Sequence, residues 1–261
     1  MSNLLQIPVF PPIELYLNSA DATIKNANLN DVTFQLPRPV LCPQGYQIYL
    51  QVLSYTIPHN FTVVNAYNNH IVINGYDDTL APGNYSIYQL VGVLTQLNPD
   101  VKCTFDSITL KCTFTSTASM TLGGPLLALL GIAQGSTGTS ISSVGTVNLA
   151  GLQSIYISTD LSSTNANIDT MVGSDSVLCR VAVNVPPSQI ISYQDFNGRS
   201  GLLLDDQQLT SIKLLLTDEA NRPLLASIDW TIALQARFIY TGAQALQVDR
   251  PLALTHQIKS M

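Results

Sequence analysis

The chain has 261 residues, of which 46% are hydrophobic and only 11% are charged, and its formal net charge is -6. Ordinary globular domains carry about 25% charged residues, and protein interfaces are poor in Lys, Glu and Asp. So few charges favour a surface shared with other subunits; a surface of Ser, Thr, Asn and Gln is the alternative. The basic residues are scattered singly, so direct binding to nucleic acid is not expected.

The N-terminal residues, MSNLLQIPVFPP, have neither the positive region nor the long apolar core of a secretory signal. Elsewhere, no apolar run approaches the ~20 residues that cross a bilayer. We therefore expect synthesis in a reducing compartment, no secretion through a signal peptide and no transmembrane segment.

Residues 1–12 are apolar and rich in proline, which fixes an extended backbone, so they are predicted to form an arm. Alternating apolar residues after this arm predict a series of strands, the second of which should end at Pro37. These strands are expected at residues 13–17, 32–36, 46–57, 61–64 and 71–73.

The sequence from about Gly75 to Ala150 departs from this strand pattern. Ser86 and Gln89 have the spacing of a capping box, and an apolar stripe that includes Leu90 and Leu94 follows at helical spacing. The stripe predicts a helix that ends at about Asn98, with Leu90 and Leu94 in the core.

A hairpin with Asp106-Ser107 at its turn is predicted after the helix. It would pair Phe105 with Ile108 and place Cys103 and Cys112 diagonally on one apolar face. We interpret both as small buried hydrophobic residues; a disulfide between them is the alternative. The segment GGPLLALLGI then predicts a short helix, and the Gly, Ser and Thr residues of 134–146 predict a flexible loop.

The segment 209–238 contains the only Trp of the chain and predicts a long antiparallel pair of strands around the polar loop TDEANRP. In its second half large apolar residues alternate from Ile228 to Phe238, which places them on one face of a strand. That face predicts core positions at Trp230, Ile232 and Leu234. The opposite face carries Asp229, Thr231, Gln235 and Arg237.

Further strands are expected at residues 154–158, 176–183, 189–193 and 202–204. Many short strands separated by turn signals predict a mainly β protein, a single jelly-roll β-sandwich with a small α+β insertion. In a jelly roll the first and last strands are neighbours, which would place residues 13–17 against 228–238. The predicted domains are an N-terminal arm (1–12), the jelly roll (13–74 and 151–243), the insertion (75–150) and a C-terminal tail (244–261).

Catalytic and metal-binding patterns are not evident. The three His residues, His59, His70 and His256, have no metal-ligand spacing. The acidic pairs Asp205-Asp206 and Asp218-Glu219 fit solvated loops, with a calcium site as the alternative. We therefore predict no catalytic residue, no cofactor, no metal and no enzymatic activity.

Several segments, in this order, resemble the penton (minor capsid) proteins of Maverick/polinton elements, adintoviruses and virophages. They are ELYLNSADATIKNANLNDVTFQL, YQIYLQVLSYTIP, APGNYSIYQLVGVLTQLN, LLALLGI, IYISTDLSS, VLCRVAVN and SIKLLLTDEANRPLLASIDWTIALQARF. Together they cover most of residues 13–238, and their order and spacing carry the resemblance. The resemblance implies a jelly-roll subunit that forms a homopentamer at each five-fold vertex of an icosahedral dsDNA virus capsid.

The same resemblance implies a virion location, synthesis inside the host cell, and contact with trimers of the major capsid protein. Other minor capsid proteins and a host receptor are further candidate partners. The arm and the tail suit segments that reach neighbouring subunits, and the polar face of the last strand should meet one in part. The candidate interface residues are Phe10, Asp229, Thr231, Gln235, Arg237, Arg250 and His256.

Three other hypotheses stay open at this point. A second position in a capsid, as a cement protein away from the vertices, would suit the same fold. A glycan- or receptor-binding spike module would cluster exposed aromatic residues in one groove, whereas the 11 Tyr are spread along the chain. A jelly-roll enzyme would need clustered His or carboxylate side chains.

Overall fold

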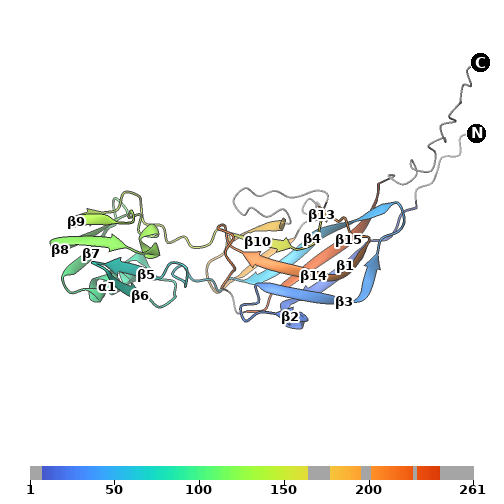
Figure 1. Cartoon of the computed structure of the whole chain (residues 1–261), viewed down its shortest axis with the longest axis horizontal. Coiled ribbons are helices and arrows are strands. Elements are labelled where there is room, and N and C mark those ends of the chain that lie inside the picture. Colours follow the sequence, from blue (N-terminus) through green and yellow to red (C-terminus); the bar gives the residue numbers. More distant parts are fainter. Residues whose placement is uncertain (1–7, 164–176, 195–200, 226–227, 242–261) are drawn as a thin grey trace, which may run out of the picture. The chain divides into compact units, whose positions relative to one another are not determined.

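The computed structural model describes residues 8–163, 177–194, 201–225 and 228–241. The chain forms two compact units (Figure 1). Unit 1 contains Met1–Pro58, Ile155–Val181 and Ile190–Met261, and unit 2 contains His59–Ser154 and Ala182–Gln189. The second unit therefore begins earlier than the predicted insertion at residue 75, because strand β5 (His70–Ile73) pairs with β8 (Lys111–Gly123) inside it.

Unit 1 is a sandwich of two antiparallel sheets. In sheet A the strand order is β1-β15-β4-β12, with β13 also paired to β4; in sheet B it is β11-β10-β14-β3-β2. The strands of sheet A are β1 (Ile13–Asn18), β4 (Tyr46–Pro58), β12 (Ile190–Gln194), β13 (Gly201–Leu203) and β15 (Thr231–Tyr240). The strands of sheet B are β2 (Ile24–Lys25), β3 (Asp31–Leu41), β10 (Ser154–Thr159), β11 (Val177–Ala182) and β14 (Gln208–Thr217). A short 3-10 helix, η1 (Ser19–Asp21), follows β1.

This strand order is that of a jelly roll, in which the chain crosses repeatedly between the two sheets in Greek-key fashion. The first and last strands of the fold are neighbours: β1 pairs antiparallel with β15, from Ile13 opposite Ala236 to Asn18 opposite Thr231. The predicted mainly β jelly-roll class and the predicted pairing of the first and last strands are both confirmed.

The predicted hairpin at 209–238 is wrong. Strand β14 pairs with β3 and β10 in sheet B, whereas β15 pairs with β1 and β4 in sheet A. The polar loop between them crosses from one sheet to the other, so the two strands face each other across the core. Their apolar faces produce the same sequence alternation in either arrangement, because a side-chain period of two reports burial and not the partner strand. Ile228, predicted inside, is exposed and precedes β15.

Pro37 does not end β3, contrary to expectation. The strand runs to Leu41, and its ladder with β14 has a register shift between Gln35 and Val40. Proline lacks a backbone N–H and is tolerated where a ladder bond is not required. The two prolines Pro37 and Pro39 therefore occupy the interrupted part of the ladder.

The core of unit 1 lies between the two sheets. Sheet A contributes Trp230, Ile232 and Leu234, which are at most 2% exposed. Sheet B contributes Phe34 on β3, whose ring meets the Trp230 ring edge to face at 6.4 Å. Such aromatic contacts add about 0.5–1.5 kcal/mol to the hydrophobic burial of the rings.

Unit 2 contains a sheet with the order β6-β5-β8-β7, with β9 also paired to β8, and it is covered by helix α1 (Ile87–Leu97). Its remaining elements are β6 (Tyr76–Thr79), β7 (Val101–Asp106), β9 (Ser136–Ser142) and the 3-10 helix η2 (Pro125–Ala128). Leu90 and Leu94 of the helix are fully buried in the core of this unit.

The predicted capping box begins helix α1. Ser86 accepts a hydrogen bond from the backbone N–H of Gln89, and the Gln89 side chain accepts one from the backbone N–H of Ser86 at 2.9 Å. Inside the same helix Gly92 is exposed, with nothing within 4 Å of the place where a Cβ would stand. A glycine inside a helix costs about 1 kcal/mol relative to alanine, so this position carries a cost that packing in unit 2 does not explain.

The Cys hairpin forms with a register different from the predicted one. Phe105 lies opposite Cys112 and Cys103 opposite Phe114, because the turn is longer: Asp106 accepts hydrogen bonds from the Ile108 N–H and the Thr109 hydroxyl. As a result Ile108 is 91% exposed instead of sharing the apolar face. Cys103 and Cys112 are still diagonal neighbours, buried and free. Their mutual hydrogen bond, together with burial, raises the pKa of the Cys103 thiol.

The expected flexible loop at 134–146 contains a strand. Residues Ser136–Ser142 form β9, which pairs with β8 and buries Ile141. The small polar residues of this segment resemble a linker in composition. They nevertheless pair with β8 on both sides of a register shift between Thr115 and Met120, so the ladder forms without a strong strand propensity. The predicted short helix at 123–132 is the single 3-10 turn η2.

Candidate subunit interface on sheet A

The outer face of sheet A carries a row of residues in register across four strands. Glu14 of β1 lies opposite Gln235 of β15, Gln235 lies opposite Gln51 of β4, and Gln51 lies opposite Gly201 of β13. These residues share one parity with Thr231 and Arg237, which places all of them on the face that points away from the core. The row is therefore polar from Glu14 to Gln51, although Gln235 and Gln51 themselves are buried.

Hydrogen bonds connect the row. The Gln51 Nε2 donates to Gln235 Oε1 at 3.3 Å, and the Arg237 Nε donates to the same oxygen at 2.6 Å. The Gln235 Nε2 donates in turn to Glu14 Oε1 at 3.5 Å. These contacts leave Gln235 only 7% exposed. A buried amide with both ends paired is held in one orientation, which makes this face rigid.

One buried atom of the row has no partner. The Oε1 of Gln51 is buried and accepts no hydrogen bond within the described chain, and a buried unpaired acceptor costs about 1–3 kcal/mol. Tyr49, on the same face of β4, lies over Gly201, where an added Cβ would come within 2.7 Å of the Tyr49 ring. Glycine at 201 is thus required for this close packing on the outer face.

The predicted interface residues in β15, and Asp229 just before it, differ in their surroundings. Thr231 and Arg237 are exposed, whereas Gln235 is enclosed by its own strand neighbours. Asp229 is exposed but accepts a hydrogen bond from the Ser19 hydroxyl at 3.2 Å, next to the start of β15. The structure therefore brings Gln235 and Arg237 together and places Asp229 in a separate local contact.

Phe10 packs against unit 1, the unit to which it belongs. Its ring meets Tyr46 edge to face at 5.1 Å and Phe238 at 6.0 Å, and it is 38% exposed. The other predicted interface residues, Arg250 and His256, lie outside the described residues, as do residues 244–261 of the predicted tail.

Sequence reasoning missed two residues of this face, Glu14 and Tyr16 on β1. Tyr16 is 76% exposed and donates a hydrogen bond to Glu14, and this bond and the negative charge of Glu14 raise the pKa of Tyr16. The alternation of IELYLN carries the signal, because Glu14 and Tyr16 have the opposite parity to the inward Leu15 and Leu17.

The first residue of each acidic pair considered for calcium has another partner. Asp218 receives hydrogen bonds from the backbone N–H groups of Ala220 and Arg222 and pairs with the Arg222 guanidinium at 2.7 Å. Asp205 accepts from the Ser162 hydroxyl. In the described parts of the chain, no group of three or more His, Cys, Asp or Glu could hold a metal ion, and no helix is long and apolar enough to cross a membrane.

No protein-family model matches the chain, and no curated protein matches it. Among solved structures, the crystal structure of selenomethionine-labelled mavirus penton protein matches 88% of this chain and 100% of that chain, with 12% sequence identity and a TM-score of 0.47. A similarity of this size does not by itself establish a shared role. The jelly-roll assignment accordingly rests on the strand order and register of unit 1.

Proposed function

We propose that this chain is a structural, non-enzymatic subunit of an icosahedral viral capsid. In this proposal it is the penton, which forms a homopentamer at the five-fold vertices and contacts the surrounding major capsid proteins. The observation that carries the proposal is the jelly-roll strand order of unit 1. Most of the segments whose sequence resembles the penton proteins lie in this unit. Jelly rolls also occur in lectins and cupins, so further support must come from the surface.

The outer face of sheet A supports a role in assembly. A five-fold ring is closed by heterologous contacts, in which one surface of each subunit meets a different surface of the next. The rigid row at Gln235, the exposed Arg237 and the exposed Tyr16 offer one such surface. Tyr and Arg are the side chains enriched in the central parts of protein interfaces.

The edge of the sheet supports the same role. Within the described chain β1 pairs on one side only, with β15. An edge strand presents unpaired backbone groups that can pair with or lie against another chain unless they are covered. Beside this edge, Ile13 and Tyr16 are exposed. A neighbouring subunit packed along β1 would cover both the backbone edge and these side chains.

Mass photometry of the purified full chain tests the proposal. A pentamer has a mass of about 141 kDa, five times the 28.2 kDa of the chain. We expect this species for the protein alone or on addition of the major capsid protein. A strict monomer under both conditions would contradict the proposal. A virion reconstruction that locates the subunit would then separate the vertex position from that of a cement protein.

A further inference from the structure

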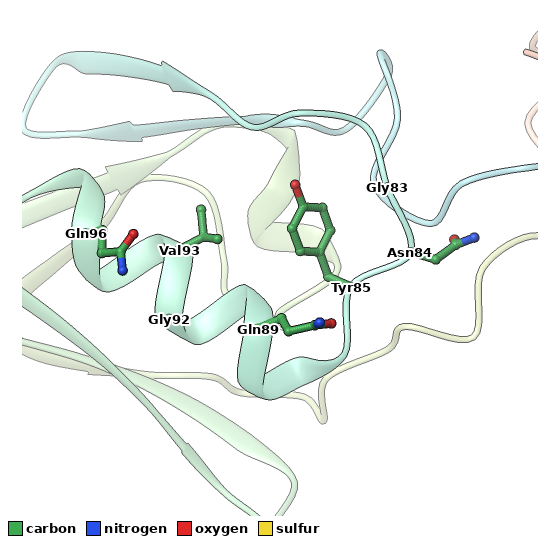
Figure 2. A pocket seen from close by; sticks show the side chains of 7 residues that line it. All are labelled: Gly83, Asn84, Tyr85, Gln89, Gly92, Val93 and Gln96. Carbon is green, nitrogen blue, oxygen red and sulfur yellow. The ribbon is translucent and has the colours of Figure 1, made fainter.

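Unit 2 contains an open cavity of about 500 Å³ beside helix α1, and none of the seven residues that line it is charged (Figure 2). Its volume lies within the range of about 300–1,000 Å³ of small-ligand sites. Figure 2 shows the Tyr85 ring and the Val93 side chain standing on the same side of the helix. The cavity therefore combines an aromatic wall, a short apolar patch and neutral polar groups.

The helix backbone lines this cavity because position 92 has no side chain. Gly92 is exposed, and a Cβ placed there would meet open space. Packing thus does not require glycine at this position, although glycine weakens the helix. A ligand that comes close to the helix backbone would account for the glycine, because glycine is often found where a ligand must approach the backbone closely.

The side chains around Gly92 are held in place before any ligand arrives. The Tyr85 hydroxyl donates to the carbonyl oxygen of Ala81 at 2.8 Å, and a Cβ at Gly83 would meet the Tyr85 ring at 3.2 Å. The oxygen of the Gln89 amide is occupied by the capping box, which leaves its N–H groups as the available donors. A side chain fixed in advance loses little entropy on binding.

The polar groups restrict the chemistry of the ligand. A charged ligand would be left without an opposite charge, because no lining residue supplies one. A purely apolar ligand would cover the exposed Gln96 amide without a hydrogen-bond partner, at a desolvation cost. A neutral ligand with several hydroxyl groups and one apolar face satisfies both constraints, because an amide both donates and accepts and an aromatic ring packs on the apolar face.

We propose that this cavity in unit 2 binds a neutral saccharide. One sugar ring lies over Gly92 with its apolar face on Tyr85, and its hydroxyl groups pair with the amides of Gln89 and Gln96. The site is independent of the assembly surface on sheet A. Failure to bind a saccharide would therefore not contradict the proposed capsid role. A protein that stays monomeric would not contradict this binding site.

The test begins with the full chain on an array of neutral, sialylated and sulfated glycans. Hits are then followed by saturation-transfer NMR and by calorimetry with the corresponding methyl glycosides. We expect neutral glycans to bind and the charged ones to bind no better than their neutral parents. The absence of neutral hits, or binding of charged glycans alone, would overturn the proposal.

Variants locate the site. Gly92→Leu fills the helix groove and Gln96→Ala removes an amide, and each should weaken binding of the neutral glycoside at least tenfold. Gly92→Leu should also melt at or above the wild-type temperature, because leucine is the better helix former. Loss of binding without loss of stability is a result that misfolding cannot produce. Gly92→Ala provides the smaller change if the leucine variant fails to fold.

The matched control is Tyr76→Ala, which removes an aromatic ring that is 74% exposed in the same unit and does not line the cavity. Tyr85→Ala should abolish the saturation transfer, whereas Tyr76→Ala should leave it unchanged. Equal binding by wild type, Gly92→Leu and Gln96→Ala would show that any glycan binds elsewhere and would overturn the assignment of the site.

Discussion

The indole N–H of Trp230 donates a hydrogen bond of 2.7 Å to the carbonyl oxygen of Leu29, a residue 201 positions earlier in the chain. Leu29 has a positive φ of 51°, in the left-handed region that is unfavourable for leucine. The Trp230 backbone is held as well, because its N–H donates to the Ser19 hydroxyl and its carbonyl accepts from the Ser19 N–H. Trp230 thus fixes the start of β15 to η1 and to the turn that precedes β3.

Two substitutions of Trp230 separate the contribution of the buried ring from that of its hydrogen bond to Leu29. Trp230→Ala removes a buried ring and should lower the free energy of unfolding by roughly 3–5 kcal/mol. Trp230→Phe keeps most of the apolar volume but leaves the Leu29 carbonyl without its donor, which should cost about 1–3 kcal/mol. Urea unfolding followed by circular dichroism measures both. Unchanged melting of a soluble Trp230→Ala protein would refute the role of this residue as a core anchor.

The sequence was sufficient to predict Trp230 as a core residue but not its contacts. Alternation from Trp230 to Ala236 is a local property, and it follows directly from burial of one face. The partners of the residue, Leu29 and Phe34, lie far away in the chain, and no local pattern specifies such pairings. For the same reason the strands β14 and β15 were expected to pair, although the chain crosses between sheets.

Alanine substitutions at two glycines of unit 2 should change its stability in opposite directions. At Gly124 the backbone has a φ of 95°, and a Cβ would come within 2.6 Å of the His70 carbonyl oxygen. Gly124→Ala should therefore lower the melting temperature markedly, by a change of more than about 1 kcal/mol in stability. Gly92→Ala meets open space and should raise stability by up to about 1 kcal/mol.

Thermal unfolding of the two variants and of the wild type under one set of conditions makes this comparison. The substitution is the same in both, so only the backbone conformation and the surrounding atoms differ. Equal melting temperatures for Gly124→Ala and Gly92→Ala would contradict the close packing of Gly124 against β5.

The pKa of Tyr55 gives a prediction for alkaline pH. Burial between the sheets raises this pKa well above 10, and the Cys179 thiol and Tyr193 add to the effect. The folded state holds the phenol proton more tightly than the unfolded state does. The stabilisation is therefore complete below pH 10, the unfolded value, and is lost as the pH rises from 10 toward the folded value.

Tyr55→Phe removes this titration and should make the decline of stability above pH 10 less steep. Tyr240→Phe, at an exposed position in the same unit, is the matched control and should follow the wild type. Denaturant midpoints measured from pH 8 to about pH 12 provide the test. Parallel curves for wild type and Tyr55→Phe would show that Tyr55 ionises without opening the core.

The candidate interface was predictable in part. The parity of β15 was enough to place Gln235 and Arg237 on the face opposite Trp230. It could not show that Gln235 is enclosed by Glu14 and Gln51, because these come from strands that join β15 only in the folded sheet. Burial therefore divides the predicted residues into those that are exposed and one, Gln235, that is enclosed within its own chain.

That division leads to a prediction about assembly. Arg237 is exposed on the outer face of sheet A, and Arg38 is exposed on β3 of sheet B. If the proposed pentamer uses the outer face of sheet A, Arg237→Glu should lower the fraction of pentamer at a fixed concentration by at least tenfold, because a reversed charge in an interface is repelled or left unpaired. Arg38→Glu makes the same change in net charge and should leave the pentamer intact.

Mass photometry gives the fraction of each species, and circular dichroism confirms that both variants fold. Raising the salt concentration helps to distinguish the causes: it should partly restore assembly if long-range repulsion dominates, since exposed charges are screened over about 10 Å at 0.1 M salt. It should do little if Arg237 is fully covered by the neighbour. Equal loss of pentamer in both variants would mean that net charge governs assembly, and the outer face of sheet A would then lose its assigned role.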